Sequence, residues 1–347
     1  MKAYVLEAVN DLQYKDVPEP ECKKGWAIVN VKACGICSSD IPRIFTKGTY
    51  HFPTIPRHEF SGVVTRVGQK ADEKWVGKRV GIFPLIPCRS CPQCAQKKYE
   101  LCENYDYTGS RRDGAFAEYV AVPVWNLIEI PENVSFQSAA MFEPLAVALH
   151  AVKRAEVKEG DSVAVIGTGM IGIAVAQWAK SFGADPVYVI GRSEEKRKLV
   201  DPLPGISYAS DVSGLPAFDR VIEAVGTPDA IAQSIALAKP EGSVLLMGNP
   251  SGDILLEQAV YWKILRKQLH VTGTWNSSYD GENASDWTEV TDALRQGKIS
   301  AEDLISHRFP KERLYDGLQL MKEHKEPYCK VMIDWEEACK TKRSLLP

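Results

Sequence analysis

The feature that most limits how this chain can fold is a glycine-rich turn with Gly167, Gly169 and Gly172. Residues 162–166 before it form a short apolar run typical of a buried strand, and a helical pattern follows to about residue 182. In that setting, glycines let a pyrophosphate approach the backbone at the helix N-terminus. The turn therefore indicates a dinucleotide site, although a plain connection between strand and helix would also explain it.

Apolar runs continue this pattern at residues 187–190, 220–224 and 243–247. Strands that alternate with helices predict an α/β fold with a parallel, doubly wound sheet. Residues 192–218 are too few for a strand and two full helices, so we expect a loop in place of one helix near 212–217.

The two ends of the chain follow a different pattern. Short alternating runs separated by Gly and Pro fill residues 1 to about 145, which predicts a small barrel-like β domain. From about residue 276 the β-α alternation stops. We expect helices around 287–296 and 312–323 and a closing strand at 330–334. A length of 347 residues suits two domains.

Composition narrows the classes of function. The net charge of −3 gives no support for nucleic-acid or membrane-surface binding, and no apolar run reaches the roughly 18 residues of a membrane span. Glu7 stands too early for a signal peptide. Nine cysteines, four of them clustered, suggest thiols in a reducing compartment, so we expect a cytoplasmic protein.

The clustered cysteines are Cys88, Cys91, Cys94 and Cys102. Gaps of two, two and seven residues are typical of a tetrahedral zinc site with four thiolates. Such a site is closed to substrate, so its predicted role is structural. Disulfides are the alternative.

A second group of potential metal ligands comprises Cys37, His58, Glu59 and Glu143. Thiol, imidazole and carboxylate together suit Zn²⁺. Cys37 and His58 alone prove little, because buried cysteines and histidines are common. Glu143 lies inside an apolar run and needs a partner, although an acid at a helix N-terminus would also explain it.

Taken together, these motifs resemble the zinc-containing medium-chain dehydrogenases. Their order is Gly-x-Cys-x-Ser-Asp, His-Glu, the four cysteines, Glu-Pro and the glycine-rich turn. Within the family the chain is most similar to polyol dehydrogenases, in particular those for hexitol phosphates such as galactitol 1-phosphate. The resemblance implies a GroES-like catalytic domain at residues 1–147 and 276–347, with a Rossmann coenzyme domain at 148–275 between them.

The resemblance also implies a reaction. A catalytic zinc would be held by Cys37 and His58, with Glu143 and Glu59 as direct or exchangeable ligands and Asp40 orienting His58. The substrate hydroxyl would lose its proton through Ser39, and hydride would pass to the nicotinamide. The products are a ketose and a reduced coenzyme. A histidine often extends this proton relay five residues after the ligand cysteine, where this chain has Pro42.

The coenzyme preference follows from the end of the second strand. NAD-specific relatives place an acid there for the ribose diol, whereas this chain has Arg192 and Ser193, followed by Lys196 and Arg197. A guanidinium suits a 2′-phosphate, so we expect NADP(H), with NAD(H) as the alternative. The predicted coenzyme site comprises Gly167, Gly169, Met170, Ile171, Gly172, Arg192, Ser193, Arg197, Gly248 and Thr274.

Four questions stay open from the sequence alone. Arg57 stands where the family usually has glycine, and we expect a surface arginine, with contact to a substrate anion as the alternative. Cations for a substrate phosphate could come from Arg43, Arg111, Arg112 or Lys263. We expect a homodimer, with a tetramer as the alternative. Rival functions are an unphosphorylated polyol dehydrogenase, a zinc-free quinone or enoyl reductase, and a catalytically silent binding protein.

Overall fold

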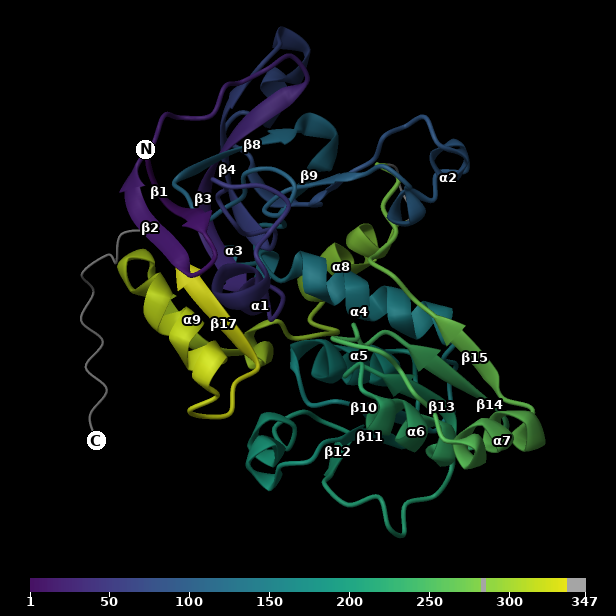
Figure 1. Ribbon diagram of the computed structural model, residues 1–347. Coiled ribbons are helices and arrows are strands. Elements are labelled where there is room, and N and C mark those ends of the chain that lie inside the picture. The colour runs from purple at the N-terminus through teal and green to yellow at the C-terminus, as the bar shows by residue number, and fades with distance from the viewer. Residues whose placement is uncertain (282–284, 336–347) are drawn as a thin grey trace.

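The computed structural model describes residues 1–281 and 285–335, which build two large sheets and two small two-stranded ones (Figure 1). One sheet has six strands in the order β12-β11-β10-β13-β14-β15, and every neighbouring pair is parallel. This confirms the doubly wound α/β prediction. The strands are β10 (Val163–Ile166), β11 (Val187–Ile190), β12 (Ile206–Ala209), β13 (Phe218–Glu223), β14 (Ala238–Leu246) and β15 (His270–Gly273).

Helices cover both faces of this sheet because alternate strand residues point to opposite sides. Val163 and Val165 join the apolar core with helices α4, α5 and α8, whereas Ala164 and Ile166 join a second core with α6. The helices are α4 (Phe142–Arg154), α5 (Met170–Ser181), α6 (Pro228–Leu237), α7 (Gln258–Lys267) and α8 (Asp286–Arg295).

The shortened unit between the second and fourth strands also agrees with the sequence. Only a 3-10 helix, Glu194–Leu199, separates β11 from β12, and a loop joins β12 to β13. Both the connection from β11 to β12 and the connection from β12 to β13 therefore lack a full α-helix.

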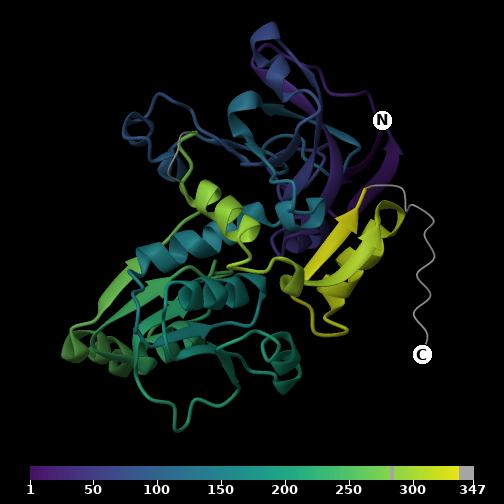
Figure 2. The same cartoon turned by 180° about the vertical axis from the view of Figure 1, so that it is seen from behind.

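The domain that we expect to be catalytic contains a seven-stranded sheet that joins the two ends of the chain. Strand β17 pairs antiparallel with β3, so Asp334 lies opposite Ala33. Figure 2 shows this C-terminal strand and helix α9 against the N-terminal half of the domain. The seven strands of this sheet are β3 (Trp26–Ile36), β4 (Phe60–Val67), β5 (Arg79–Ile82), β8 (Tyr119–Pro123), β9 (Leu127–Glu129), β16 (Ile305–Pro310) and β17 (Lys330–Asp334).

Sequence patterning missed strand β16, which runs parallel to β17 at the edge of the sheet. Its alternate residues are exposed, so it lacks a strong apolar signal. The predicted C-terminal helices and closing strand are confirmed. The remaining strands and α-helices of the described residues are β1 (Lys2–Ala8), β2 (Asp11–Asp16), β6 (Leu85–Ile86), β7 (Asp106–Tyr107), α1 (Asp40–Pro42), α2 (Pro92–Ala95), α3 (Phe136–Ala139) and α9 (Leu314–Glu323).

Helix α4 joins the two domains, and the predicted boundary between residues 147 and 148 falls inside it. Ala146 and Ala148 on either side are fully buried. The helix therefore forms a continuous wall from the catalytic domain to the coenzyme domain. Within the described part of the chain, no helix is both long and apolar enough to cross a membrane.

Candidate metal and coenzyme site

The pairing of β3 with β4 brings the first two candidate ligands together. Cys34 lies opposite Phe60 in this antiparallel pair, so the segment after β3 and the segment before β4 meet at one end. A Cys37 Sγ, a His58 ring nitrogen and a Glu59 carboxylate oxygen lie within 4.8 Å of one another. Glu143 reaches the same region from the first turn of α4.

These donors fit a zinc ion. The Nδ1 atom of His58 is buried and has no hydrogen-bond partner within the described structure. Burial and the nearby Arg57 lower the pKa of His58, which keeps the imidazole in its neutral, metal-binding form. Burial and Glu59 raise the pKa of Cys37, so the thiol needs a cation to ionise. Cys37, His58 and a carboxylate would supply that cation's ligands.

Glu143 is bound to a residue that the sequence analysis did not single out. The Tyr107 hydroxyl donates a 3.1 Å hydrogen bond to Glu143 Oε1, and the Tyr107 ring lies edge-on to His58 with centroids 5.6 Å apart. Burial raises the pKa of Glu143 to about 7, although His58 opposes the shift. Tyr107 lies in strand β7, which follows the four clustered cysteines in the chain. No local sequence motif predicts its contact with Glu143.

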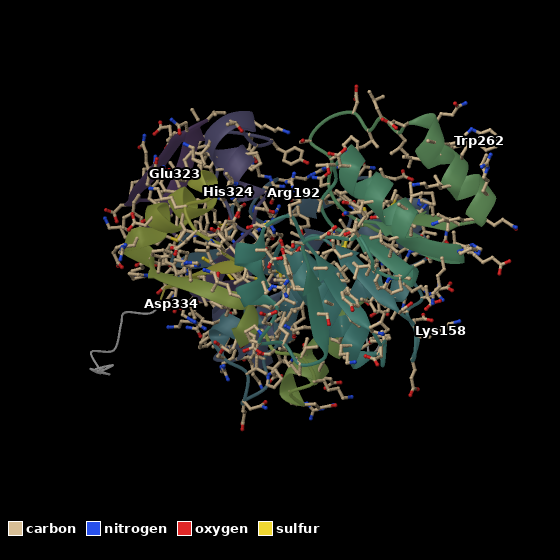
Figure 3. All side chains as sticks on the ribbon, turned by 90° about the horizontal axis from the view of Figure 1, so that it is seen from below. Lys158, Arg192, Trp262, Glu323, His324 and Asp334 are labelled. Carbon is tan, nitrogen blue, oxygen red and sulfur yellow. The ribbon has the colours of Figure 1, made fainter. Side chains whose placement is uncertain are left out.

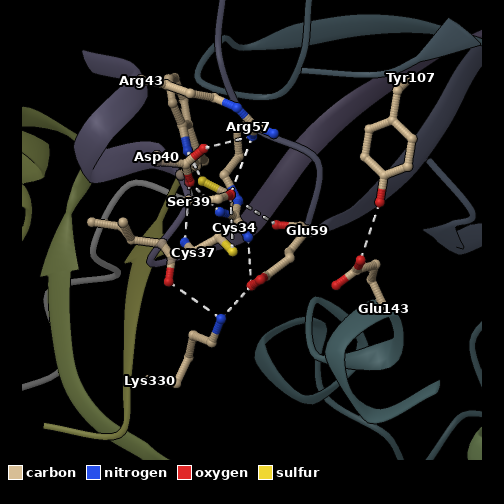
Figure 4. A network of polar contacts seen from close by, with 12 residues as sticks. Cys34, Cys37, Ser39, Asp40, Arg43, Arg57, Glu59, Tyr107, Glu143 and Lys330 are labelled. Carbon is tan, nitrogen blue, oxygen red and sulfur yellow. Dashed lines mark hydrogen bonds and ion pairs between the residues drawn. The ribbon is translucent and has the colours of Figure 1, made fainter. Parts of the chain in front are cut away.

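A buried network of two acids and two bases lies behind the ligands (Figure 4). Arg57 Nη1 donates a 2.5 Å hydrogen bond to Asp40 Oδ2, and Arg57 Nη2 is paired with Glu59 Oε2. Lys330 Nζ donates to the same Glu59 oxygen at 2.6 Å. The network is at most 4% exposed at any of the four residues. The prediction that Arg57 lies on the surface is therefore wrong.

Asp40 also differs from expectation. Its Oδ2 accepts hydrogen bonds from the Cys37 amide at 3.1 Å and from Arg57, so it fixes the ligand loop rather than the His58 ring. Burial alone would raise the pKa of Asp40, but Arg57 holds that pKa below its usual range. Asp40 thus stays ionised next to the candidate metal.

The backbone of Arg57 takes a conformation that glycine adopts more easily. Its φ of +105° costs a residue with a side chain about 1–3 kcal/mol. The loop that carries Gly109 and Gly114 packs directly on it, because a Cβ at either glycine would lie 2.1 or 2.0 Å from Arg57 backbone atoms. Hydrogen bonds from Arg57 N to Gly109 O and from Ala115 N to Arg57 O hold the turn.

A cavity of about 240 Å³ opens beside these ligands, between the two domains. His58, Glu143 and Ser39 line it from the catalytic side, and Met247, Asn249 and Thr274 from the coenzyme side. Ser39 Oγ lies 3.2 Å from Cys37 Sγ and accepts a 3.2 Å hydrogen bond from Arg43. Aromatic and basic residues complete the wall: Arg43, Tyr50, Tyr105, Tyr107, Arg111 and Trp275.

A second cavity, of about 510 Å³, lies over the glycine-rich turn. Gly167 and Gly169 line its floor, and Arg192, Ser193 and Lys196 line the end next to β11. Figure 3 shows Arg192 near the middle of the molecule, between the catalytic and coenzyme sides. This arrangement suits a dinucleotide whose adenosine end reaches Arg192.

The other predicted coenzyme residues are not among those that line this cavity. Arg197 is directed away: it pairs with Glu194 at 2.8 Å and lies 5.0 Å over the Tyr208 ring. Lys196 lines the cavity instead. Thr274 lines the substrate-side cavity. The remaining three act in packing: Met170 begins helix α5, Ile171 packs against the core, and at Gly248 a Cβ would lie 2.0 Å from Gly226 N.

Gly172 explains why the turn needs its third glycine. A Cβ there would lie 2.1 Å from the Gly167 carbonyl oxygen, so helix α5 could not approach the end of β10. The acid at the end of β13, Glu223, is 1% exposed and accepts 2.7 Å hydrogen bonds from the amides of Val225 and Gly226. It shapes the loop that borders the dinucleotide cavity.

The four clustered cysteines form a separate lobe. Their sulfurs lie within 4.8 Å of one another, and Cys88 Sγ and Cys94 Sγ are 3.9 Å apart. Those separations exceed the roughly 2.05 Å of a disulfide and suit four thiolates around one ion. Hydrogen bonds from Ser90 lower the pKa of Cys88 to about 6, which favours the thiolate. Arg89 attaches the lobe to the catalytic domain, 4.6 Å over the Trp125 ring.

The cysteines outside the two clusters are isolated thiols in the described structure. Cys22, Cys34 and Cys329 are all unpaired, as expected. Cys339, which we also expect to be a free thiol, lies outside the described residues.

Comparison with known proteins agrees with this arrangement. Residues 23–132 match the alcohol dehydrogenase GroES-like domain family, and residues 171–296 match the zinc-binding dehydrogenase family. The chain is 33% identical to galactitol 1-phosphate 5-dehydrogenase of Escherichia coli K12 over 320 residues. The alignment covers 89% of this chain and 92% of that enzyme. The crystal structure of the galactitol-1-phosphate dehydrogenase from Escherichia coli matches 96% of this chain and 100% of its own, with a TM-score of 0.88 and 32% identity.

Two other solved structures contain a coenzyme. One is RspB of Escherichia coli CFT073 complexed with NADH, at 28% identity and a TM-score of 0.87 over 96% of this chain and 99% of that one. The other is a zinc-binding dehydrogenase of Sinorhizobium meliloti 1021 bound to NADP, at 30% identity and a TM-score of 0.85 over 96% and 98%. The chain therefore belongs to the zinc-dependent medium-chain alcohol dehydrogenases, within their polyol dehydrogenase branch.

Proposed function

We propose that this enzyme interconverts a polyol phosphate and its ketose phosphate with NADP(H), using zinc held by Cys37, His58 and Glu143. One observation carries the choice of a phosphorylated substrate. Arg43 and Arg111 line the same cavity as His58 and Glu143. Two guanidinium groups at the wall of a small cavity give an anionic substrate a place to bind. The similarity to a galactitol 1-phosphate enzyme supports the same class.

Arg111 is held in a fixed position by its neighbours. Its guanidinium lies 4.6 Å over the Tyr50 ring and 4.3 Å over the Tyr105 ring, and Nη1 donates to the Tyr105 carbonyl at 2.9 Å. Its Nε is buried and has no hydrogen-bond partner within the described structure. A stacked guanidinium with a spare donor is suited to bind phosphate with little loss of side-chain freedom.

Arg43 remains available because another cation neutralises its nearest acid. Arg43 Nη1 lies 3.9 Å from Asp40 Oδ1, whereas Arg57 lies 2.5 Å from Asp40 Oδ2. Because electrostatic attraction falls with distance, Asp40 interacts more strongly with Arg57 than with Arg43. Arg43 therefore contributes positive charge to the cavity, next to the Ser39 hydroxyl that it contacts.

Catalysis would combine the metal with Ser39. When bound, zinc supplies Lewis-acid chemistry that makes a substrate hydroxyl more acidic. Ser39 Oγ lies in the cavity wall and is placed to relay that proton: the oxygen would accept it while the serine's own hydroxyl proton passes to water or to the coenzyme ribose. Arg43, which donates to Ser39 Oγ, favours a serine oxygen that accepts.

The coenzyme preference rests on the cavity over the glycine-rich turn. Arg192, Ser193 and Lys196 supply two cations and a hydroxyl where a ribose acid would stand. Such a set suits the 2′-phosphate of NADP(H). Relatives of similar fold include one with NADH and one with NADP, so the support for NADP(H) comes from these residues of this chain and not from the relatives.

A substrate panel tests the function. Purified enzyme is assayed with free and phosphorylated hexitols and pentitols, each with NADP and NAD. We expect the highest kcat/KM for a hexitol phosphate with NADP. A clear preference for unphosphorylated polyols contradicts the phosphate proposal and favours a sorbitol- or xylitol-type dehydrogenase. Full activity in a Cys37→Ser variant with one zinc per chain would instead favour a zinc-free reductase.

We also propose a cytoplasmic homodimer. Strand β15 ends the coenzyme sheet and leaves one edge unpaired within the described residues. Exposed apolar side chains accompany it: Tyr261, Trp262 and Leu265 on α7 and Val271 on β15. Figure 3 shows Trp262 at the outer edge of the coenzyme side. A second copy would cover this face by extending the sheet, and light scattering measures the resulting mass.

A further inference from the structure

Arg57 is the residue of this site whose position the family resemblance explains least. It occupies a turn that glycine would adopt without strain, and its side chain is fully buried. Its three donor groups all have acceptors nearby: Nη1 faces Asp40, Nη2 is paired with Glu59, and Nε donates to the Glu59 carbonyl at 3.2 Å. Two of these contacts hold the residue that follows the candidate ligand His58.

Glu59 is held from a second side by Lys330. Lys330 Nζ donates to Glu59 Oε2 at 2.6 Å and to the Ile36 carbonyl at 3.2 Å. Gly35 leaves room for this pair, since a Cβ there would lie 2.9 Å from Glu59 Oε2 and 3.0 Å from Lys330 Cδ. One carboxylate oxygen of Glu59 thus has two buried cationic partners.

The two carboxylates near the candidate metal therefore differ in their surroundings. Glu143 lines the substrate cavity with His58, and its Oε1 accepts a hydrogen bond from a neutral tyrosine. Glu59 has no place among the residues that line this cavity, and it is bound to Arg57 and Lys330 (Figure 4). A Glu59 carboxylate oxygen lies within 4.8 Å of the Cys37 and His58 donor atoms, so Glu59 is within reach of a metal. The two buried cations on its Oε2 nevertheless neutralise the carboxylate and hold it in place, whereas in the described structure Glu143 has a neutral tyrosine as its hydrogen-bond donor.

We propose that Arg57 is a positioning residue that, together with Lys330, holds Glu59 off the catalytic metal, so that Cys37, His58 and Glu143 are the resting protein ligands. Removal of the arginine frees a carboxylate within reach of the metal and removes a nearby positive charge. Both changes strengthen metal binding. The inference rests on the proposed catalytic zinc site.

Chelator competition tests this inference. Zinc-loaded enzyme is titrated with a chelator, and the release of the catalytic ion is followed. In Arg57→Gly, which suits the φ of +105°, we expect at least a tenfold higher chelator concentration for half release. Lys330→Met is expected to shift the release in the same direction. Arg66→Gln removes an equal charge from an exposed pair on β4 and is expected to leave the release unchanged.

Glu59→Gln tests whether Glu59 is a resting ligand and whether it causes the gain in Arg57→Gly. In the otherwise unchanged chain we expect zinc release within threefold of wild type, because Glu59 is not a resting ligand. In the Arg57→Gly background we expect Glu59→Gln to remove the gain. Cobalt substitution gives an independent measurement, because the visible spectrum of the cobalt enzyme is expected to change in Arg57→Gly and to revert in the double variant.

Two results would overturn the inference. One is a tenfold easier loss of zinc in Glu59→Gln alone, which identifies Glu59 as a resting ligand even if Arg57→Gly fails to fold. The other is a folded Arg57→Gly enzyme with unchanged zinc release and cobalt spectrum. A Cys37→Ser variant separates failure of this inference from failure of the proposed zinc site. If the variant keeps both zinc ions, the proposed catalytic site is wrong. If it loses one ion, the site is right and only the role of Arg57 is wrong.

Discussion

The Tyr107 hydroxyl donates a 3.1 Å hydrogen bond to Glu143 Oε1, which couples the strand beside the cysteine lobe to the first turn of the helix that joins the two domains. The contact orients a buried carboxylate toward the cavity that contains His58. A residue that acts on a metal ligand from outside in this way contributes to metal affinity and to turnover.

Tyr107→Phe is therefore expected to lower kcat/KM or zinc affinity by about 10–100-fold while the protein stays folded. Steady-state kinetics and metal analysis measure the two effects. Tyr105→Phe is the control, because it keeps the ring that contacts Arg111 in the same cavity. Equal effects of the two substitutions would contradict a specific role for the Tyr107–Glu143 bond.

Arg111→Met is expected to raise KM for a polyol phosphate by about 10–100-fold, since a hydrogen bond to a charged group contributes about 1.5–3 kcal/mol. The kcat/KM for unphosphorylated polyols is expected to change less than threefold. Substitution of the adjacent Arg112 by Met is the control. Arg112 pairs with Asp106 at 2.6 Å, lies 4.6 Å over the Trp26 ring and lines a different cavity. A similar loss for both substrate classes would mean that Arg111 only supports the cavity wall.

Arg192→Ala is expected to lower kcat/KM for NADPH by at least about tenfold and to leave the value for NADH nearly unchanged. Arg197→Ala is the matched control, because that side chain pairs with Glu194 and is directed away from the coenzyme cavity. Kinetics with both coenzymes measure the ratio. A wild-type preference for NADH would refute the NADP(H) proposal directly.

Cys94→Ser is expected to release one zinc per chain and to lower the thermal midpoint by several degrees, because a closed four-thiolate site contributes to folding. Metal analysis and differential scanning calorimetry report the two changes. If the variant instead lost all turnover while the fold and the second zinc stayed intact, the structural and catalytic sites would be the reverse of our assignment.

Asp219 provides a test of stability against pH. Burial opposes ionisation, but hydrogen bonds from Ser162 and Lys239 lower the pKa of Asp219 to about 2. A lowered pKa means that the ionised group stabilises the fold above about pH 4 and loses this contribution as the pH falls toward 2. Because Asp219 is 36% exposed, we expect about 1 kcal/mol rather than the full shift.

Urea unfolding of wild type and Asp219→Asn at pH 7, 4 and 3 measures this contribution. The difference between the two proteins is expected to be largest at pH 7 and to shrink toward pH 3. Asp292→Asn, which breaks an exposed pair with Arg295, is expected to show a negligible difference at each pH. A constant difference between wild type and Asp219→Asn would contradict the ionic origin of the effect.

The sequence was sufficient where the signal is local. The glycine-rich turn is fixed by the close approach of helix α5 to β10, which depends on residues within the same short segment. The four cysteines are likewise near one another in the chain, so their spacing alone predicts that their sulfurs can converge. The shortened stretch between Arg192 and Phe218 could be predicted simply from the number of residues available.

The surroundings of the candidate metal ligands, in contrast, depend on contacts between residues far apart in the chain. Lys330 reaches Glu59 because β17 returns from the far end of the chain to pair with β3, and Tyr107 reaches Glu143 across 36 positions. Arg57 reads as a surface cation in sequence, because nothing beside it reveals that Asp40 and Glu59 will enclose it. Burial of a charge depends on partners that long-range pairing assembles, whereas ligand spacing depends only on the geometry of a short piece of chain.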